Sequence, residues 1–143
     1  MSDTVPLLVA AVALVDDLDR PTRVLAARRT GPPELAGGWE FPGGKVEPGE
    51  QPEAAARREG QEELGVRVRL GERVGEAAWP LTGSAVRDLW WAGALPGEPG
   101  PRALQDHDQV RWLSVEELFE VAWLPADLPI VEHLAGLLHT PGS

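Results

Sequence analysis

The chain of 143 residues contains no cysteine and no tyrosine. The absence of cysteine excludes disulfide bonds, thiol nucleophiles and cysteine-ligated zinc or iron–sulfur centres, and it favours a reducing compartment. A domain of this length buries roughly two thirds of the surface of its unfolded chain, which is enough for stability without such cross-links. Its length, its 43% of hydrophobic residues and its 25% of charged residues predict one globular domain over residues 1–143.

Basic residues and long apolar runs are also scarce. The 13 Lys and Arg residues stand against 23 Asp and Glu, which gives a net charge of −10 and disfavours tight binding to nucleic acid. The longest apolar run, residues 5–15, has about half of the roughly 20 residues that a membrane-spanning helix needs. No positively charged leader is present at residues 1–3. We therefore expect a cytoplasmic protein that does not enter a membrane.

Hydrophobic patterns predict short strands framed by two or three helices. Apolar, largely β-branched residues on both faces predict a buried central strand at 7–15, with a hairpin partner at 24–27. Good helix formers between Pro52 and Gly65 predict the clearest helix, at 52–64. The other expected elements are an extended piece at 39–41, strands at 66–70, 73–79, 86–95 and 109–113, a short helix at 114–121 and a final helix at 128–138. This order indicates an α/β sandwich or an α+β fold.

Three carboxylates stand together on the predicted helix. Glu59, Glu62 and Glu63 occupy positions i, i+3 and i+4, so they emerge from one side of it. Unpaired, such carboxylates repel one another, whereas a bound Mg²⁺ or Mn²⁺ ion is held by carboxylates, water and substrate phosphates. Taken alone, three glutamates more commonly form a solvated helix face. The neighbouring residues decide between these two interpretations.

The helix belongs to a longer spaced pattern of glycine, glutamate, arginine and aliphatic residues: Gly44, Glu50, Arg58, Glu59, Glu62, Glu63, Gly65 and Val66. This pattern, Gly-x5-Glu-x7-Arg-Glu-aliphatic-x-Glu-Glu-x-Gly-aliphatic, resembles the Nudix box at every fixed position. Gly60 departs from it, because the family has an aliphatic residue there. A glycine inside a helix costs about 0.5 to 1 kcal/mol relative to alanine. Two alternatives explain Gly60: sequence drift that the neighbouring packing tolerates, or the close approach of another backbone segment.

The resemblance to the Nudix hydrolase family covers nearly the whole chain. Residues 39–46 are similar to the segment before the box in the MutT branch, and residues 124–127 are similar to that branch's approach to its final helix. Within the branch, the chain is most similar to bacterial 8-oxo-dGTP diphosphatases and CTP pyrophosphohydrolases. The resemblance implies an α/β/α sandwich around a mixed sheet. It also implies Mg²⁺-dependent or Mn²⁺-dependent hydrolysis of a nucleoside triphosphate, (d)CTP, 5-methyl-dCTP or 8-oxo-dGTP, to nucleoside monophosphate and pyrophosphate, in nucleotide-pool sanitation.

The resemblance implies roles for the residues of the box. The implied metal ligands are three carboxylates and one backbone carbonyl, from Glu59, Glu62, Glu63 and Gly44. Arg58 and Glu50 are implied to orient these carboxylates, as partners of metal ligands commonly do. Asp106 stands six residues before Trp112, where the branch has a glutamate, and is the candidate general base. It is also interpretable as a metal ligand or as a polar loop acid, and its neighbour His107 is expected to face solvent.

Substrate contacts are expected around the turn that the sequence predicts at Gly43 and Gly44. Lys45 and Arg29 are the candidates for phosphate binding, and Arg28 replaces Arg29 if the strand register shifts by one residue. Asp127 stands where the branch has an asparagine that contacts the base, and a carboxylate there accepts from an amino group or caps the final helix. Glu40 and Phe41 complete the predicted substrate-binding set. Trp90 and Trp91 are candidates for base stacking, although most tryptophans are expected in the core.

Three other functions fit the sequence less well. A Nudix hydrolase of a nucleotide sugar or dinucleotide shares the box. A nucleotide-sensing module binds without cleaving, although all of the box glutamates are present. A structural protein with a solvated acidic helix needs no ligand at all. Monomer and homodimer are both compatible with the sequence.

Overall fold

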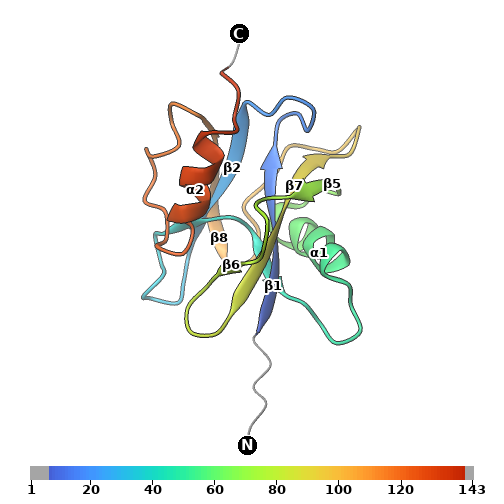
Figure 1. Ribbon diagram of the computed structural model, residues 1–143, viewed down its shortest axis with the longest axis vertical. Helices are drawn as coiled ribbons and strands as arrows, with labels where there is room; N and C mark the ends of the chain where they lie inside the picture. The colour runs from blue at the N-terminus through green and yellow to red at the C-terminus, as the bar shows by residue number, and fades with distance from the viewer. Residues whose placement is uncertain (1–6, 141–143) are drawn as a thin grey trace, which may run out of the picture.

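The computed structural model describes residues 7–140 and places one mixed β-sheet between two helices (Figure 1). Residues 1–6, which include the segment where no leader was expected, lie outside the described residues. The strands are β1 (Leu8–Val15), β2 (Arg23–Arg29), β3 (Trp39–Glu40), β4 (Gly43–Lys45), β5 (Val68–Arg73), β6 (Trp79–Pro80), β7 (Val86–Ala94) and β8 (His107–Ser114). The helices are α1 (Pro52–Leu64) and α2 (Leu128–Ala135).

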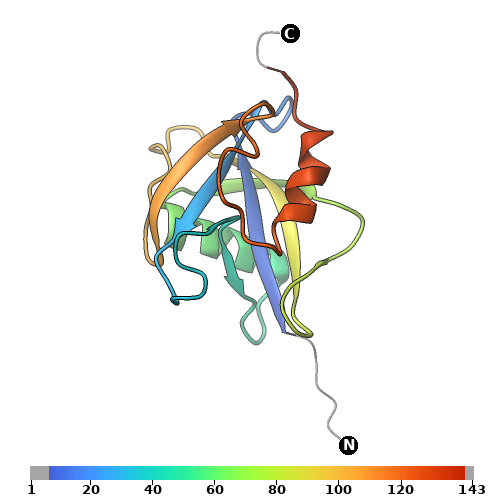
Figure 2. The same cartoon turned by 90° about the vertical axis from the view of Figure 1, so that its left-hand side faces the viewer.

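Strand β1 lies at the centre of the sheet. It pairs in parallel with β7 and antiparallel with β2 and β4, within the strand order β3-β2-β1-β7-β5. Strand β8 pairs antiparallel with β2, and Figure 2 shows the two strands side by side. Both parallel and antiparallel ladders therefore meet in one sheet, and the expected mixed sheet is confirmed.

Alternate residues of β1 face the two helices. Ala10, Val12 and Leu14 pack in the apolar cluster that includes α1 residues, whereas Ala11, Ala13 and Val15 pack in the cluster that includes α2 residues. A strand with period-two side chains is apolar on both faces only where both faces are covered. Figure 1 shows α1 and α2 on opposite sides of the sheet, so the α/β/α arrangement is confirmed.

Helix α1 has the bounds that the sequence predicts. Pro52 lies in its first turn, where a missing N–H costs nothing. Gly65 ends the helix with φ of 69°, a left-handed conformation that glycine adopts freely. The segment before β8 then caps the helix, because the N–H of Arg102 donates to Leu64 O at 2.9 Å and that of Leu104 donates to Glu63 O at 3.0 Å.

Two predicted elements are wrong. The strand predicted at 73–79 is interrupted because Gly75 has φ of 85° and the Trp79 indole N–H folds back to donate to Val74 O at 2.9 Å. The helix predicted at 114–121 is a series of turns. Only half of its capping box forms, with Ser114 N–H donating to the Glu117 carboxylate at 2.9 Å.

Two further boundaries differ from the prediction. The Gly43–Gly44 turn is the edge of strand β4, since Gly43 and Gly44 pair with Ala11 and Ala10 of β1. Helix α2 ends at Ala135 rather than at residue 138, and the next residues form a turn over Leu134.

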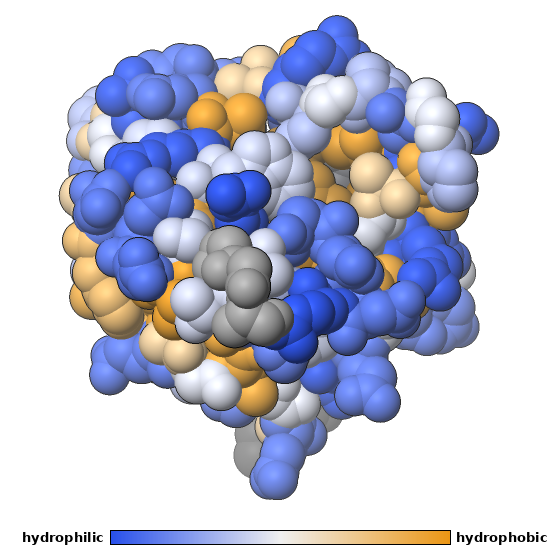
Figure 3. Space-filling model, turned by 90° about the horizontal axis from the view of Figure 1, so that it is seen from above, coloured by the Kyte–Doolittle hydropathy of each residue, from blue (hydrophilic) through white to orange (hydrophobic). Residues whose placement is uncertain are grey.

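Neither helix of the described chain is long and apolar enough to cross a membrane. Seen from above, the surface is largely hydrophilic, with apolar residues in small separate patches (Figure 3).

Candidate active site

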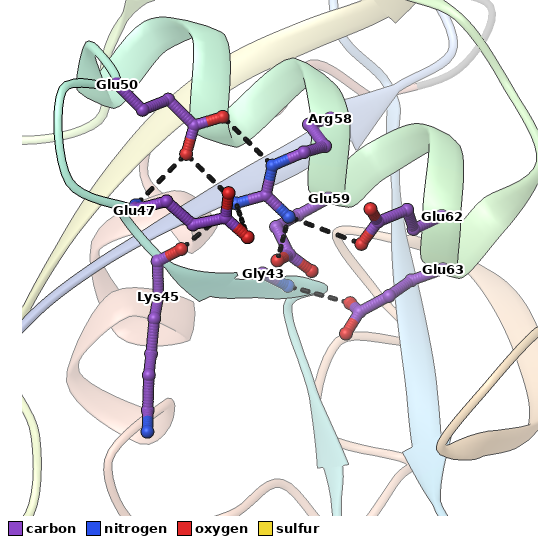
Figure 4. Close-up of polar contacts among 8 residues, drawn as sticks. All are labelled: Gly43, Lys45, Glu47, Glu50, Arg58, Glu59, Glu62 and Glu63. Carbon is purple, nitrogen blue, oxygen red and sulfur yellow. Dashed lines mark hydrogen bonds and ion pairs between the residues drawn. The ribbon is translucent and has the colours of Figure 1, made fainter.

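Strand β4 lies directly against the carboxylate face of α1 (Figure 4). The N–H of Gly43 donates to Glu63 Oε2 at 2.9 Å, and the carbonyl of Lys45 accepts from Arg58 Nη2 at 3.0 Å. A Cβ atom built on Gly44 would overlap the carboxylate of Glu59. Glycine at position 44 therefore permits an approach between strand and helix that a side chain would prevent.

Arg58 holds most of the carboxylates of the box. It forms a two-bond pair with Glu50, from Nε at 2.9 Å and from Nη2 at 3.0 Å, and its Nη1 donates to Glu59 at 2.7 Å and to Glu62 at 3.3 Å. These bonds, with Glu50 first, raise the pKa of Arg58 further above its ordinary value, and they lower the pKa of Glu50. Arg58 is therefore a fixed cation that sets the directions of three carboxylates.

Burial perturbs the two inner carboxylates. Glu63 is only 4% exposed, and this burial, opposed by His107 and assisted by Glu59 and Glu40, raises its pKa to about 8. Burial also raises the pKa of Glu59, although the Arg58 hydrogen bond acts in the other direction. Such a shift means that negative charge is held here at a cost that a bound cation would offset.

The donor set fits a hard divalent cation in its chemistry. Three carboxylates rise from one face of α1, and oxygen ligands of this kind suit Mg²⁺ and Mn²⁺. Among residues 7–140, however, no three acidic or histidine side chains gather tightly enough to form a ready-made metal site. Glu59 and Glu62 are turned toward Arg58, and Glu63 is turned toward Gly43. These long side chains would have to rotate for their oxygens to share one ion.

A pocket of about 210 Å³ lies beside β4. Its walls include three cationic side chains and most of the predicted substrate-binding residues: Arg29, Glu40, Phe41, Gly43, Gly44, Lys45, Leu81 and Arg87. Gly43 and Gly44 line the pocket and also contact α1, so strand β4 connects the pocket to the carboxylate face of the helix, although none of Glu59, Glu62 and Glu63 lines the pocket itself. The exposed Lys45 side chain points away from the carboxylates in Figure 4. Arg29 donates to Glu40 and to the carbonyl of Gly31, each at 2.9 Å.

The neighbouring arginine serves elsewhere. Arg28 forms an ion pair with Asp108 at 2.8 Å, and both side chains are partly exposed. The pocket wall contains Arg29 and not Arg28. The strand register therefore favours Arg29 over Arg28 as the candidate for phosphate binding.

Sequence reasoning missed Arg87, which is 4% exposed on β7 and lines the pocket. Its Nη2 lies 3.1 Å from Asp127 Oδ1, but the contact is not aligned as a hydrogen bond. Nε and Nη2 of Arg87 are buried without a hydrogen-bond partner among the described residues. A signal was present, because Arg87 stands two residues before the core residue Leu89 and so faces inward on the same strand.

Asp127 precedes α2 but does not cap it with its side chain. Its Oδ1 accepts the backbone N–H of Phe41 at 3.2 Å and lies against Arg87. Burial raises the pKa of Asp127 to about 6, although the charge of Arg87 opposes that shift. The interpretation of this side chain as an N-cap is therefore wrong.

The aromatic residues are mainly core. Trp90 is 6% exposed and packs in the cluster under α1, which excludes it as an open stacking surface. Trp91 is partly buried and packs against the opposite cluster. Phe41 lines the pocket, yet its ring is buried and stacks on Trp123 with ring centroids 4.9 Å apart.

The Asp106 loop is fixed to β2. The carbonyl of Asp106 accepts the backbone N–H of Thr30 at 2.8 Å and its hydroxyl at 3.0 Å, while the residue itself is exposed. Gln105 before it has φ of 53°, an uncommon conformation for a side-chain-bearing residue that often marks a functional segment.

His107 does not face solvent as predicted. Its side chain is fully buried on β8, and Nε2 lies 2.9 Å from Glu40 Oε2. Burial lowers the pKa of His107, but the hydrogen bond to Glu40 and the charge of Glu63 outweigh it and raise the pKa above its ordinary value.

Comparisons with known proteins agree with the geometry. A sequence profile described as the NUDIX domain matches residues 6–134. The chain belongs to the Nudix hydrolase family. It is 42% identical over 135 residues to a putative 8-oxo-dGTP diphosphatase 2 of Mycobacterium tuberculosis, covering 92% of this chain and 90% of the relative.

Two further relatives of this Nudix protein support the same assignment. The CTP pyrophosphohydrolase of Escherichia coli is 33% identical over 130 residues, covering 91% of this chain and 93% of that protein. The crystal structure of a MutT NUDIX hydrolase from Burkholderia pseudomallei superimposes with a TM-score of 0.71 at 25% identity, covering 92% of this chain and 99% of that one. The expected family and its MutT-like fold are confirmed.

Proposed function

We propose that this Nudix protein hydrolyses a nucleoside triphosphate to nucleoside monophosphate and pyrophosphate, with (d)CTP, 5-methyl-dCTP or 8-oxo-dGTP as substrate, as a cytoplasmic enzyme of nucleotide-pool sanitation. One observation carries the proposal. The carboxylate face of α1 is sealed against β4, and the same strand lines a pocket with three cationic side chains. Relatives named as an 8-oxo-dGTP diphosphatase and a CTP pyrophosphohydrolase suggest the two base classes.

Phosphate binding needs local cations, because the chain as a whole carries a net charge of −10. Arg29 and Lys45 line the pocket beside Gly43 and Gly44, within reach of a phosphate chain that lies along β4. The guanidinium of Arg29 is held by Glu40 and Gly31, so its remaining N–H groups are already oriented. We assign phosphate positioning to these two side chains.

Glu59, Glu62 and Glu63, with the carbonyl of Gly44, are the groups that would hold Mg²⁺ or Mn²⁺. When bound, such ions neutralise phosphate charge and make a water molecule more acidic. Glu50 and Arg58 keep the carboxylates oriented through their mutual hydrogen bonds. Phosphoryl transfer depends mainly on positioning and charge neutralisation, and these residues supply both.

Asp106 is the candidate base. Its exposed carboxylate oxygen would accept a proton from the attacking water. The two hydrogen bonds from Thr30 to its carbonyl tie the loop to the strand that carries Arg29. The candidate general base Asp106 and the phosphate-binding Arg29 are thereby held on adjoining backbone segments.

Arg87 and Asp127 are the candidates for contact with the nucleobase. Arg87 offers donors and Asp127 offers an acceptor, a combination that pairs with the amino and ring-nitrogen edge of cytosine. It also pairs with a purine edge that presents a carbonyl beside an N–H group. Arg87 lines the pocket, whereas Asp127 is buried behind it, so a base that contacts Asp127 has to enter beside Arg87.

A substrate panel tests the proposal. Release of pyrophosphate is measured with CTP, dCTP, 5-methyl-dCTP, 8-oxo-dGTP, a nucleotide sugar and a dinucleotide. Glu62→Gln removes one implied ligand and is expected to lower turnover at least about tenfold. Glu53→Gln, an exposed acid in the first turn of the same helix, is the matched control and is expected to retain turnover. Full turnover in Glu62→Gln would overturn the metal assignment, and pyrophosphate release from no triphosphate would overturn the activity.

A further inference from the structure

Three strands bring His107, Glu40 and Arg29 to one face of the sheet. Arg29 of β2 is the register partner of His107 of β8, and Ala27 of β2 is the partner of Glu40 of β3. Ala27 shares a face with Leu25, which packs in the α1 cluster, and the β2–β8 ladder shifts register between Arg28 and Arg29 where His107 pairs. The charges of His107 and Glu40 both act on the pKa of Glu63 of α1. The three polar side chains therefore meet on the side of the sheet that carries the carboxylate helix.

One carboxylate oxygen joins the group. Glu40 Oε2 accepts from Arg29 Nη1 at 2.9 Å, and His107 Nε2 lies 2.9 Å from the same oxygen. An ionised carboxylate can only accept, so this contact requires His107 to carry a proton on Nε2. Its Nδ1 is buried and has no partner within residues 7–140, so Glu40 is the one side chain among them that the ring hydrogen-bonds, while Glu63 affects it by charge alone.

Only two of these three residues line the pocket. Arg29 and Glu40 line it, whereas the fully buried ring of His107 does not. A single hydrogen bond from His107 leaves Glu40 less free to rotate away from Arg29. Glutamate and arginine side chains each lose considerable rotamer freedom when ordered, so a second donor on the shared carboxylate lowers the cost of presenting Arg29 to a ligand.

We infer that His107 is a positioning residue that acts through Glu40 to hold the Arg29 guanidinium in the pocket for the phosphate chain of the substrate. The inference rests on the proposed function for the identity of the ligand. It does not involve proton transfer, because His107 touches neither the pocket nor the Asp106 carboxylate in the described contacts. Its loss should therefore appear in substrate binding rather than in the chemical step.

A matched pair of polar variants tests the geometry. The amide nitrogen of glutamine reaches approximately the ε position of a histidine ring, whereas that of asparagine reaches only the δ position. His107→Gln is expected to keep KM within about threefold of the wild type, and His107→Asn to raise KM about tenfold with little change in kcat. His107→Leu is expected to behave like the asparagine variant. A loss confined to kcat, or equal KM values for the glutamine and asparagine variants, would overturn the inference.

A double-mutant cycle tests the route through Arg29. In an Arg29→Met background the target of the positioning is gone, so His107→Asn is expected to change KM less than about twofold. The same tenfold change in both backgrounds would show that His107 acts by another route. Thermal melts of each variant accompany the kinetics, so that a fold defect is recognised.

A spectroscopic measurement keeps the inference separate from the activity. Long-range ¹H–¹⁵N spectra of the wild-type protein report which nitrogen of each of the three histidines carries a proton. His107 is expected to show a protonated Nε2, with a changed shift in Glu40→Gln. A neutral His107 with its proton on Nδ1 would overturn the inference even if the enzyme were fully active. A protonated Nε2 in a protein that cleaves no triphosphate would leave the contact standing and overturn the proposed function instead.

Discussion

Arg58 and Arg87 are used in opposite ways. Arg58 of α1 lies among the carboxylates of the box, which we call the Arg58 end of the site, and Arg87 of β7 lines the pocket, which we call the Arg87 end. Arg58 donates to Glu50, Glu59 and Glu62 and to the carbonyl of Lys45. Arg87 is more deeply buried, yet its Nε and Nη2 have no hydrogen-bond partner among residues 7–140. One arginine is satisfied by the protein, and the other has donors left over.

The difference separates positioning from recognition. Buried donors are nearly always satisfied, so donors without a protein hydrogen bond in a pocket wall are available to water or to a ligand. A satisfied arginine instead fixes the carboxylates around it and has little left for a substrate. We therefore expect Arg58 to support the proposed metal ligands on α1 and Arg87 to contact the substrate.

The largest expected effect comes from removing Arg87. Arg87→Met leaves Asp127 as an uncompensated buried acid, and breaking a buried ion pair costs about 3 to 5 kcal/mol of unfolding free energy. Chemical denaturation measures this cost. The matched variant Asp127→Asn keeps an oxygen to accept the Phe41 N–H but leaves the buried Arg87 charge without its counterion, so it should lose stability as well. If Arg87→Met is as stable as the wild type, the pair has no structural role.

The pH dependence of the Arg87→Met variant has a defined sign. Burial already raises the pKa of Asp127 to about 6 with Arg87 present, and loss of the arginine charge raises it further. A pKa that is higher in the folded state contributes stability at low pH, and that stability is lost as pH rises through the folded pKa. The variant should therefore gain stability on going from pH 8 to pH 5 relative to the wild type. If the variant gains no stability at pH 5, the stability lost on removing Arg87 does not come from the charge of Asp127.

Removing Arg58 should mainly affect catalysis. In Arg58→Met the carboxylates of Glu50, Glu59 and Glu62 lose their shared donor, and such changes around metal ligands typically cost ten- to a hundredfold in activity. Steady-state kinetics at several Mg²⁺ concentrations measures the loss. The exposed neighbour Arg57 is the matched control, as Arg57→Met. Equal kinetics for the two variants would remove the contrast between Arg58 and Arg87.

The Arg58 end of the site could be predicted from local sequence. Pro52 and Gly65 mark the helix ends by rules that act within one turn, and the spacing of Glu59, Glu62 and Glu63 places them on one side of the helix. The same local rules gave a wrong prediction at residues 114–121. There the indole N–H of Trp123 donates to the carbonyl of Leu118 at 2.6 Å, and the segment forms turns instead of a helix. Local signals are reliable where no distant partner competes for the backbone.

The Arg87 end could not be predicted in the same way. Arg87 meets Asp127 across 40 residues of sequence, and His107 meets Glu40 across 67. These contacts depend on strand register and on which loops return to the same edge, and a one-residue change in register would move each side chain to the other face. The alternation of β7 indicated an inward arginine, but not the carboxylate that it meets.

Mg²⁺ or Mn²⁺ should stabilise the folded protein by binding to the carboxylates around Arg58 and not to Asp127. A ligand that binds only the folded state adds about 2.7 kcal/mol at a hundredfold excess over its dissociation constant. The melting temperature of the wild type should therefore rise with either ion and be nearly unaffected by Na⁺ at equal ionic strength. Glu62→Gln should show a smaller rise, whereas Asp127→Asn should respond like the wild type. An equal response in all three proteins would mean that the ions bind elsewhere.

The smallest expected effect separates the packing of α1 from its chemistry. Gly60 is buried on the side of the helix that faces β1 and β5, and an added Cβ would lie 3.8 Å from Val12 and 3.9 Å from Val68, at ordinary contact distance. No backbone approaches closely, so the explanation of Gly60 by close approach is wrong.

Gly60→Ala should therefore stabilise the protein by about 0.5 to 1 kcal/mol through helix propensity. For a domain of this size, that gain corresponds to a rise of about 1 to 4 °C in melting temperature. Turnover should stay at the wild-type level, because the Arg58 hydrogen bonds lie on the other face of the helix. A stabilised variant with lower turnover would instead show that flexibility of α1 at Gly60 helps its carboxylates to reach a metal ion.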